Sequence, residues 1–347
     1  MSATYGIIGS GSWATALAKI LTDRQFRVNW WIRNEDTLRH VRQRYHNPHY
    51  LSSVNFDPAL LQLSADVRTV VKDSTVLVIA VPSAFVEATL APLQPADWES
   101  KKVVSAVKGL LPARDSLLNV YLKEQFGIPL ENYFAVLGPC HAEEVAAEKL
   151  SYLTFSGIDV TGASSIAADF SVDYINTIVN PDIIGVQYAA VLKNIYALGA
   201  GIAHGLDYGD NFLSVYIANA ADEMAGFLKQ AGAEHIVVGE QEGEDPVTHR
   251  RLPNYAASVY LGDLLVTCYS LYSRNRTFGN MIGKGYSVKA AQLEMNMVAE
   301  GYNAAKCIYH LNQTLGAPMT IADTIYRILW ENVKAGEGFK RIESVLV

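Results

Sequence analysis

The sequence predicts an α/β Rossmann-like amino-terminal domain with a mostly parallel sheet, followed by an all-α carboxy-terminal domain. Three observations predict this fold class. A glycine-rich turn follows the first apolar run, short apolar runs then alternate with helical segments, and from about Asp182 onward the apolar spacing is helical. We therefore place the two domains at residues 1–185 and 186–347.

The strand candidates of the first half are short β-branched or aromatic runs bounded by Gly, Pro or polar residues. In chain order they are "YGII", "FRVNWWI", "STVLVIAVP", "KKVVSAVKG", "YFAVLGP" and "SYLTFSG". The helical segments "WATALAKILT" and "NEDTLRHVRQR" follow the first two of them. This order is typical of βαβ units, in which helices cover both faces of a parallel sheet.

The second half contains long segments in which apolar residues recur at helical spacing. They are "GVQYAAVLKNIYALGAGIA", "NFLSVYIANAADEMAGFLKQAG", "YAASVYLGDLLVTCYSLY", "AAQLEMNMVAEGYNAAKCIYHL" and "TIADTIYRILWENV". No Ser/Gly-rich linker separates the halves, so we expect a helix to join them. The polar segment 239–254, "GEQEGEDPVTHRRLPN", predicts a surface excursion.

Composition excludes several classes of function. The 347 residues carry a formal net charge of -7, so no global positive field recruits nucleic acid or an acidic membrane surface. Cys140, Cys268 and Cys307 lack C-x-x-C spacing, and we find no metal-ligand cluster, which favours a reducing cytoplasmic setting without a bound metal. We find no apolar run of about 20 residues that would span a membrane.

The turn after the first predicted strand has the spacing of a dinucleotide-binding loop. Gly9, Gly11 and Ala14 form G-x-G-x-x-A, in which the first glycine makes the turn, the second lets a pyrophosphate approach, and the alanine allows close helix packing. The helix after the loop offers backbone N–H groups to the phosphates. A tight turn without chemical meaning is the alternative, but the strand before and the helix after favour a dinucleotide.

The end of the second predicted strand bears on cofactor choice. An NAD-selective enzyme usually presents a carboxylate there, whereas "WWIRNED" places Arg33, which suits a 2′-phosphate. Glu35 and Asp36 can contact the ribose, but we favour them as acidic residues of the next helix's first turn. The sequence therefore favours NADP(H), with NAD(H) as the alternative.

Lys193 lies on a helical face of mostly small residues. Its neighbours three and four positions away are Ala189, Ala190, Tyr196 and Ala197. Such a lysine either extends its ammonium group to the surface or has a function. A desolvated lysine has a lowered pKa and exchanges a proton near neutral pH, as reduction of a carbonyl requires.

A second polar group lies in "GDLLVTCYSLYSRNRTFG". Asp263, Thr267, Ser273, Arg274 and Asn275 combine a carboxylate with donors that suit a phosphate, although an ordinary helix end has a similar composition. Lys108 follows a predicted strand. Ligands of such folds bind at that sheet edge, but a strand-end lysine can simply be solvated.

Taken together, these stretches resemble the bacterial-type NAD(P)-dependent glycerol-3-phosphate dehydrogenases. The resemblance covers nearly the whole chain, through "GIIGSGSWATALA", "VPS", "SAVKGL", "LGPCHAEEVA", "GVQYAAVLKNIYALGAGI", "LGDLLVTCYSLYSRNRTFG" and "EGYNAAK". It implies reversible NAD(P)H-dependent reduction of dihydroxyacetone phosphate to sn-glycerol 3-phosphate, which supplies phospholipid synthesis in the cytoplasm. The sequence leaves the oligomeric state open, with a homodimer as one option.

The resemblance also implies roles for individual residues. Lys193 would be the general acid and base at the substrate C2 oxygen, with Asp263 orienting it. The implied substrate contacts are Lys108, Gly138, Cys140, Asn194, Thr267, Ser273, Arg274 and Asn275. The implied cofactor contacts are Gly9, Gly11, Ser12, Trp13, Arg33, Tyr50, Lys108, Ala142, Arg274 and Glu300.

Two stretches depart from the family pattern. The family commonly has Ser or Thr where this chain has Cys140, and a thiol is a weak donor, so the backbone there is the better candidate for a contact. Segment 239–254 is longer and more polar than the family's usual approach to the aspartate. Two alternative functions remain: a related two-domain hydroxyacid dehydrogenase, and a non-catalytic dinucleotide-sensing module.

Overall fold

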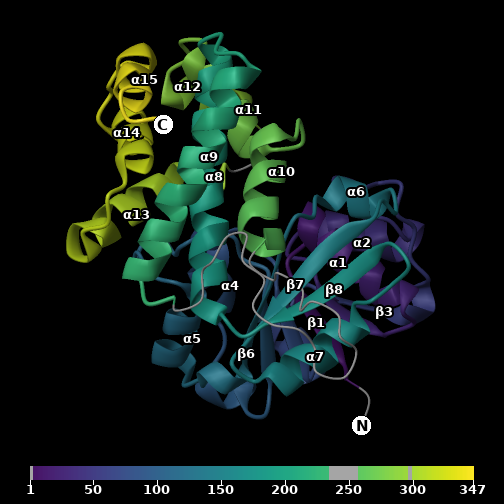
Figure 1. Ribbon diagram of the computed structural model, residues 1–347. Helices are drawn as coiled ribbons and strands as arrows, with labels where there is room; N and C mark the ends of the chain where they lie inside the picture. The colour runs from purple at the N-terminus through teal and green to yellow at the C-terminus, as the bar shows by residue number, and fades with distance from the viewer. Residues whose placement is uncertain (1–2, 234–256, 296–298) are drawn as a thin grey trace, which may run out of the picture. The chain divides into compact units, whose positions relative to one another are not determined.

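The computed structural model describes residues 3–233, 257–295 and 299–347 (Figure 1). Segment 239–254 therefore lies outside the described residues. The chain divides into two compact units. One comprises Met1–Val107 and Ser116–Ile183, and the other Lys108–Asp115 and Ile184–Val347. We call them the sheet unit and the helical unit.

The sheet unit is built on an eight-stranded sheet in the order β3-β2-β1-β4-β5-β6-β7-β8. All neighbouring strands are parallel except β6 and β7. The strands are β1 (Tyr5–Ile8), β2 (Val28–Trp31), β3 (Leu61–Ser64), β4 (Val76–Ile79), β5 (Lys102–Ser105), β6 (Tyr133–Leu137), β7 (Ser151–Ser156) and β8 (Ile175–Asn180). The Rossmann-like, mostly parallel fold is thus confirmed, although the sequence reading missed β3 and β8.

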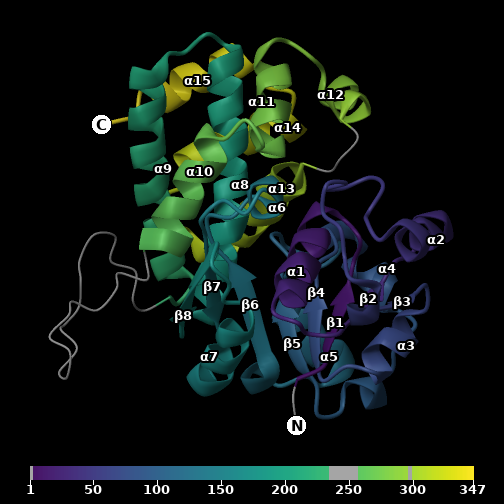
Figure 2. The same ribbon diagram turned by 90° about the vertical axis from the view of Figure 1, so that its right-hand side faces the viewer.

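Helices connect these strands. They are α1 (Ser12–Asp23), α2 (Glu35–Arg44), α3 (Val67–Lys72), α4 (Val86–Leu90), α5 (Leu118–Phe126), α6 (Ala142–Ala146) and α7 (Val160–Asp169). Because parallel crossovers are right-handed and the strand order reverses after β3, α1 and α3 cover opposite faces of the sheet. Figure 2 shows α1 in front of β1 and β4. This arrangement places the β1–α1 turn at the carboxyl end of the central strand.

Buried apolar side chains on both elements hold α1 against the sheet. Ile7, Leu17 and Trp30 are fully buried, as are the facing strand residues Val78 and Phe134. Each fully buried apolar side chain contributes about 1.5–3 kcal/mol relative to its exposed state. The start of α1 is therefore held on a rigid base.

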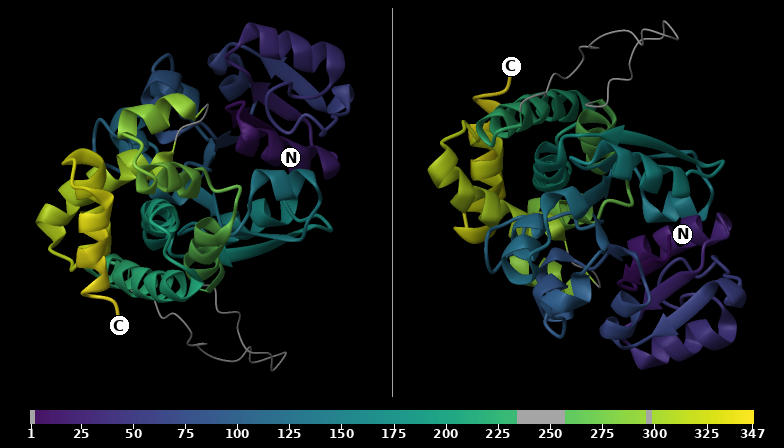
Figure 3. Two further views of the ribbon diagram at one scale, coloured as in Figure 1. Left: turned by 90° about the horizontal axis from the view of Figure 1, so that it is seen from above. Right: turned by 90° about the horizontal axis from the view of Figure 1, so that it is seen from below.

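The helical unit carries the rest of the chain. Its helices are α8 (Ile183–Gly205), α9 (Asp210–Gln230), the π-helix η5 (Ala257–Gly262), α10 (Asp263–Tyr269), α11 (Arg274–Gly283), α12 (Val288–Glu294), α13 (Glu300–Leu315), α14 (Thr320–Trp330) and α15 (Ala335–Glu343). Both views of Figure 3 show α14 and α15 side by side at the carboxy-terminal end. The single helix predicted over residues 290–311 is two helices, because Met295 and Ala299 both have extended backbones.

Glycines let α8 and α11 approach each other closely. A Cβ at Gly201 of α8 would collide with the Arg276 carbonyl, and one at Gly279 of α11 would collide with the Leu198 carbonyl. Gly205 and Gly283 oppose each other in the same way one turn later. These glycines explain why "ALGAGIAHG" and "FGNMIG" carry small residues at helical spacing, and they set the distance between the two helices that bear the candidate site.

The expectation that no apolar run has the length of a spanning helix was wrong for α8. Among the described residues, α8 alone is long and apolar enough to span a membrane, with 23 residues and a mean hydropathy of 1.2 over its most apolar window. However, 89% of that window is buried within the protein. The apolar length of α8 is that of a core helix.

Candidate active site

The glycine loop between β1 and α1 has two glycines with different reasons to be glycine. Gly9 has φ +134°, and a Cβ there would lie 2.5 Å from the Ala80 carbonyl oxygen, so the backbone itself requires glycine. A Cβ at Gly11 would meet nothing within 4 Å. Neither strain nor packing in the protein explains Gly11, whereas close approach of a ligand does.

The first turn of α1 lies directly after this loop. Gly11 is the N-cap of α1, and no side chain caps the helix. The amino-terminal end of a helix attracts anions through its backbone N–H groups and its dipole. The loop and the helix start therefore fit the phosphates of a dinucleotide.

The start of α2 after β2 bears on whether Glu35 and Asp36 are ribose contacts or acidic residues of the first helical turn. Arg33 is exposed, and α2 begins at Glu35 with the Asn34 side chain as its cap. Glu35 and Asp36 lie in the first turn of α2, and Asp36 pairs with Arg39. The interpretation of Glu35 and Asp36 as first-turn residues is confirmed, and the contact of Arg33 with a 2′-phosphate stays a prediction.

Lys193 and Asp263 form a buried ion pair in the helical unit. Lys193 lies in the middle of α8 and is 3% exposed, and Asp263 begins α10 and is 1% exposed. Burial lowers the pKa of Lys193 to about 8 against the opposing attraction of Asp263, and the nearby positive charge of Lys108 lowers it further. Lys193 therefore does not extend its ammonium group to the surface, and its lowered pKa is the property that the sequence predicted for a desolvated lysine.

A chain of amide side chains joins Lys108 to α13. The Asn194 amide nitrogen donates to the Lys108 carbonyl (3.0 Å), and the Asn194 oxygen accepts from the Asn275 amide (2.9 Å). The Asn275 oxygen accepts in turn from the Gly301 backbone N–H (2.9 Å). Asn194 and Asn275 are both buried, so the chain connects α8, at the residue next to Lys193, to Lys108 and to the start of α13.

Around the start of α11, the side chains of Thr267 and Ser273 bond within the protein, whereas the cationic side chain of Arg274 is exposed. The Thr267 hydroxyl donates to the Asp263 carbonyl (2.6 Å), and the Ser273 side chain caps α11 by accepting from Arg276 N–H (3.3 Å). Arg274 is exposed, and it has no ion-pair partner among the residues that the structure describes. Of this group, Arg274 is the side chain best able to bind a phosphate.

Comparisons with known proteins now bear on this geometry. Residues 4–161 match the amino-terminal part of the NAD-dependent glycerol-3-phosphate dehydrogenase family, and residues 182–340 match its carboxy-terminal part. The chain belongs to this family. It is 32% identical over 332 residues to glycerol-3-phosphate dehydrogenase [NAD(P)+] of Streptococcus equi subsp. zooepidemicus, covering 95% of this chain and 93% of that protein.

Two further comparisons agree. The protein of the same name from Streptococcus uberis is 33% identical over 343 residues, with 98% of this chain and 94% of the relative covered. The crystal structure of glycerol-3-phosphate dehydrogenase from Coxiella burnetii superimposes with a TM-score of 0.86 at 25% identity and covers 98% of each chain. The family resemblance therefore extends over both units.

The segment that carries Lys108 groups with a different part of the chain from the one that the sequence suggested. The sequence reading assigned Lys108 to the first domain, but by its contacts Lys108–Asp115 belongs to the helical unit. The Asn194 hydrogen bond holds one end of this segment. The hydrogen bond between the side chains of Asp115 and His310 of α13 (2.9 Å) holds the other.

The remaining predicted residues are distributed over both units. In the sheet unit, Gly138 has φ +130°, and a Cβ there would lie 2.7 Å from the Tyr152 carbonyl oxygen, so the backbone requires glycine. Cys140 and Ala142 are buried nearby in sequence, and Tyr50 and Trp13 are half-buried. In the helical unit, Glu300 begins α13 one residue before Gly301. The roles of these residues stay predictions.

Each unit also contains a buried residue near predicted site residues that the sequence did not single out. Cys268 is fully buried near Lys193, and burial raises the pKa of its thiol to about 12, so it is a neutral neighbour. Asn47 is fully buried although it lies in the polar run "YHNPHY". Nothing in their local pattern marks either residue, because the neighbours that they contact or face are distant in sequence.

Proposed function

We propose that this protein catalyses the reversible NAD(P)H-dependent reduction of dihydroxyacetone phosphate to sn-glycerol 3-phosphate in the cytoplasm, and so supplies glycerophospholipid synthesis. The observation that carries the proposal is the buried Lys193–Asp263 pair, with its lowered lysine pKa, in a chain of this family. Residues 1–185 would form the NAD(P)-binding domain and residues 186–347 the substrate and catalytic domain, with the oligomeric state left open and a homodimer as one option.

The sheet unit fits the dinucleotide. Gly9 and Gly11 shape the loop, and the backbone of Ser12 at the start of α1 would hold the pyrophosphate, with Trp13 beside it. When bound, the reduced nicotinamide supplies the hydride that converts the substrate carbonyl carbon to an alcohol carbon. Exposed Arg33 would contact a 2′-phosphate, which supports a preference for NADP(H), with NAD(H) as the alternative.

Lys193 would supply the proton of the reaction. In the reducing direction its ammonium group donates a proton from Nζ to the C2 oxygen and stabilises the negative charge that develops there. In the oxidising direction the neutral amine accepts that proton from the C2 hydroxyl. Asp263 holds the lysine side chain in place, and the lowered pKa leaves both protonation states accessible near neutral pH.

Arg274 would bind the substrate phosphate. The side chains of Asn275 and Ser273 already bond to Gly301, Asn194 and the α11 backbone, whereas the Arg274 side chain is exposed. Lys108 would add a second positive charge. Phosphate binding away from C2 contributes energy that positions the carbonyl for reaction.

The test is the initial rate of NADPH oxidation, and separately of NADH oxidation, by the purified protein with dihydroxyacetone phosphate. We expect turnover, with the larger kcat/KM for NADPH. Turnover only with a non-phosphorylated keto acid would identify a hydroxyacid dehydrogenase instead. Cofactor binding by folded protein without turnover of any such substrate would favour the dinucleotide-sensing module.

A further inference from the structure

Three consecutive carbonyl groups of the glycine loop each accept a hydrogen bond from a side chain outside the loop. The Trp30 indole nitrogen donates to Gly9 O (2.6 Å), and the Asn47 amide donates to Ser10 O (3.0 Å). The Thr15 hydroxyl donates to Gly11 O (2.9 Å). The donors come from β2, from the segment after α2 and from α1, so the loop is held from three sides of its own unit.

These donors are buried and linked to one another. Trp30, Asn47 and Thr15 are each 0% exposed. The Asn47 amide also donates to the Thr15 hydroxyl oxygen (3.0 Å), so its two hydrogens bind two different targets. A buried amide with both hydrogens used is costly to disturb, which fixes the orientation of its partners.

Asn47 connects the loop to a second segment. Its side-chain oxygen accepts from the backbone N–H groups of His49 (3.0 Å) and Tyr50 (3.3 Å). Asn47 therefore uses its full hydrogen-bonding capacity, donating to the glycine loop and accepting from the segment that carries Tyr50.

Holding the carbonyls also orients the N–H groups. In a trans peptide the C=O of one residue and the N–H of the next point in opposite directions. Carbonyls bonded to buried donors therefore turn the N–H groups of Ser10, Gly11 and Ser12 away from those donors. The same bonds keep the partially negative carbonyl oxygens from facing an anion, as in other backbone anion sites.

We propose that Trp30, Asn47 and Thr15 are positioning residues that orient three consecutive peptide groups toward the dinucleotide phosphates. Asn47 additionally sets the segment of Tyr50 against the same loop. This inference rests on the proposed function, since it assumes that the loop binds NAD(P)H. It explains the full burial of an asparagine whose role the loop motif by itself does not indicate.

The test uses Asn47→Asp, which keeps the shape and the acceptor oxygen but removes both donors, and Asn47→Leu, which removes them without adding charge. The matched control is Asn29→Asp on β2. Asn29 is 5% exposed, and its amide donates to Asp73 O (2.8 Å) and Ser74 Oγ (2.9 Å), away from the loop. The measurements are the Kd for NADPH and NADH by fluorescence titration without substrate, and the Tm of each variant.

We expect both Asn47 variants to raise the cofactor Kd at least about tenfold, because loss of one or two buried hydrogen bonds is worth roughly 1–3 kcal/mol. Asn29→Asp should lower the Tm about as much as Asn47→Asp does, because it also loses buried hydrogen bonds. Its cofactor Kd should stay within about twofold of that of the wild type. Thr15→Val, an isosteric change at a helical position, should raise the Kd in the same direction even if the Asn47 variants do not fold.

Two results would overturn the inference alone: folded Asn47 or Thr15 variants that bind the cofactor as wild type does, or a Kd increase for Asn29→Asp as large as that for Asn47→Asp. A folded wild-type protein that binds neither NADPH nor NADH would overturn the proposed function, and the inference with it.

Discussion

Two lysines are buried among the residues that the structure describes, and they differ in what surrounds them. Lys19 on α1 is 8% exposed and Lys193 on α8 is 3% exposed. Each forms an ion pair with an aspartate, Asp23 for Lys19 and Asp263 for Lys193. By burial and pairing alone the two lysines are alike, yet we assign chemistry to only one of them.

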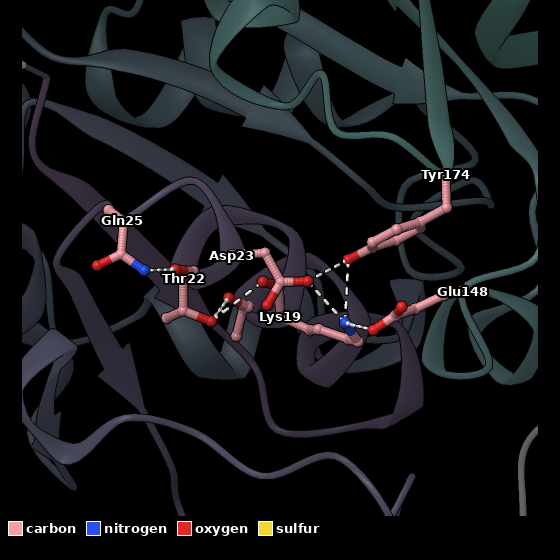
Figure 4. A network of polar contacts seen from close by, with 7 residues as sticks. Lys19, Thr22, Asp23, Gln25, Glu148 and Tyr174 are labelled. Atoms are coloured by element: carbon pink, nitrogen blue, oxygen red, sulfur yellow. Dashed lines mark hydrogen bonds and ion pairs between the residues drawn. The ribbon is translucent and has the colours of Figure 1, made fainter.

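The partners make the difference. The Lys19 ammonium donates to Asp23 (2.6 Å), Glu148 (2.9 Å) and the Tyr174 hydroxyl (3.2 Å), as Figure 4 shows. Burial would lower the pKa of Lys19, but these hydrogen bonds outweigh it and raise the pKa above its ordinary value. Lys19 stays charged and links α1 to the segment after α6 and to the start of β8.

One carboxylate, that of Asp263, and one positive charge, that of Lys108, act on the Lys193 ammonium group. Burial lowers its pKa to about 8, Asp263 opposes the change only in part, and Lys108 adds to it. Burial of a lysine therefore does not predict acid–base chemistry by itself. The balance of acceptors and like charges around the ammonium group decides whether it can release a proton.

The largest expected effect is a loss of kcat on replacement of Lys193 but not on replacement of Lys19. Lys193→Met should lower kcat by about 10²–10⁴-fold, the range typical for loss of a general acid, with the Kd for NADPH unchanged within about twofold. Lys19→Met should leave kcat near wild type but lower stability by roughly 1–3 kcal/mol, because Asp23 and Glu148 lose a partner. Steady-state kinetics and thermal unfolding of both variants check this, and equal kcat losses would remove the distinction.

The next effect concerns the phosphate. Arg274→Ala should raise the KM for dihydroxyacetone phosphate about 10- to 100-fold, since a charge-assisted hydrogen bond contributes about 1.5–3 kcal/mol. Arg276 is the matched control. It lies on the same helix, and its guanidinium donates to the Tyr269 carbonyl (2.9 Å), so Arg276→Ala should lower the Tm with a smaller change in KM. An unchanged KM for Arg274→Ala would place the phosphate elsewhere.

The pH dependence of the reaction rate tests whether the positive charge of Lys108 lowers the pKa of Lys193. Reduction requires protonated Lys193, so kcat/KM for reduction should be flat below about pH 8 and fall above it, while oxidation should rise toward the same pH. Lys108→Met removes a charge that lowers the lysine pKa, so the midpoint of both profiles should move upward. Rate measurements at pH values on both sides of the Lys193 pKa of about 8 test this, and a downward move of the midpoint would contradict it.

The smallest effect concerns cofactor choice. Arg33 is exposed, so its contact with a 2′-phosphate is weakened by solvent. Arg33→Ala should weaken NADPH binding roughly 3- to 10-fold while leaving NADH within about twofold, as separate titrations would show. Equal losses for the two cofactors would mean that Arg33 does not distinguish them.

A candidate site residue can be predicted from the sequence where its own neighbours in the chain carry the signal. Lys193 stands out because its helical face is otherwise small and apolar, and Gly9 and Gly11 stand out by their spacing. Asn47 and Cys268 could not be found this way, because their partners lie on other elements. Residues that support a site leave little local pattern.

The fold shows the same limit. The buried central strands β1, β4 and β6 were predicted because their runs are continuously apolar. The edge strands β3 and β8 were missed, since each is only partly buried and carries polar residues such as Gln62 and Thr177. The break between α12 and α13 was missed because the apolar spacing continues across it.

The most direct test of the account is a titration of the two lysines. NMR of protein labelled at lysine Cε, with Lys193→Met and Lys19→Met to assign the signals, reports the pKa of each ammonium group without any turnover. We predict a pKa near 8 for Lys193 and no titration of Lys19 at or below the ordinary lysine pKa of 10.5. An ordinary pKa for Lys193, or matching values for the two lysines, would contradict the claim that their partners set their chemistry.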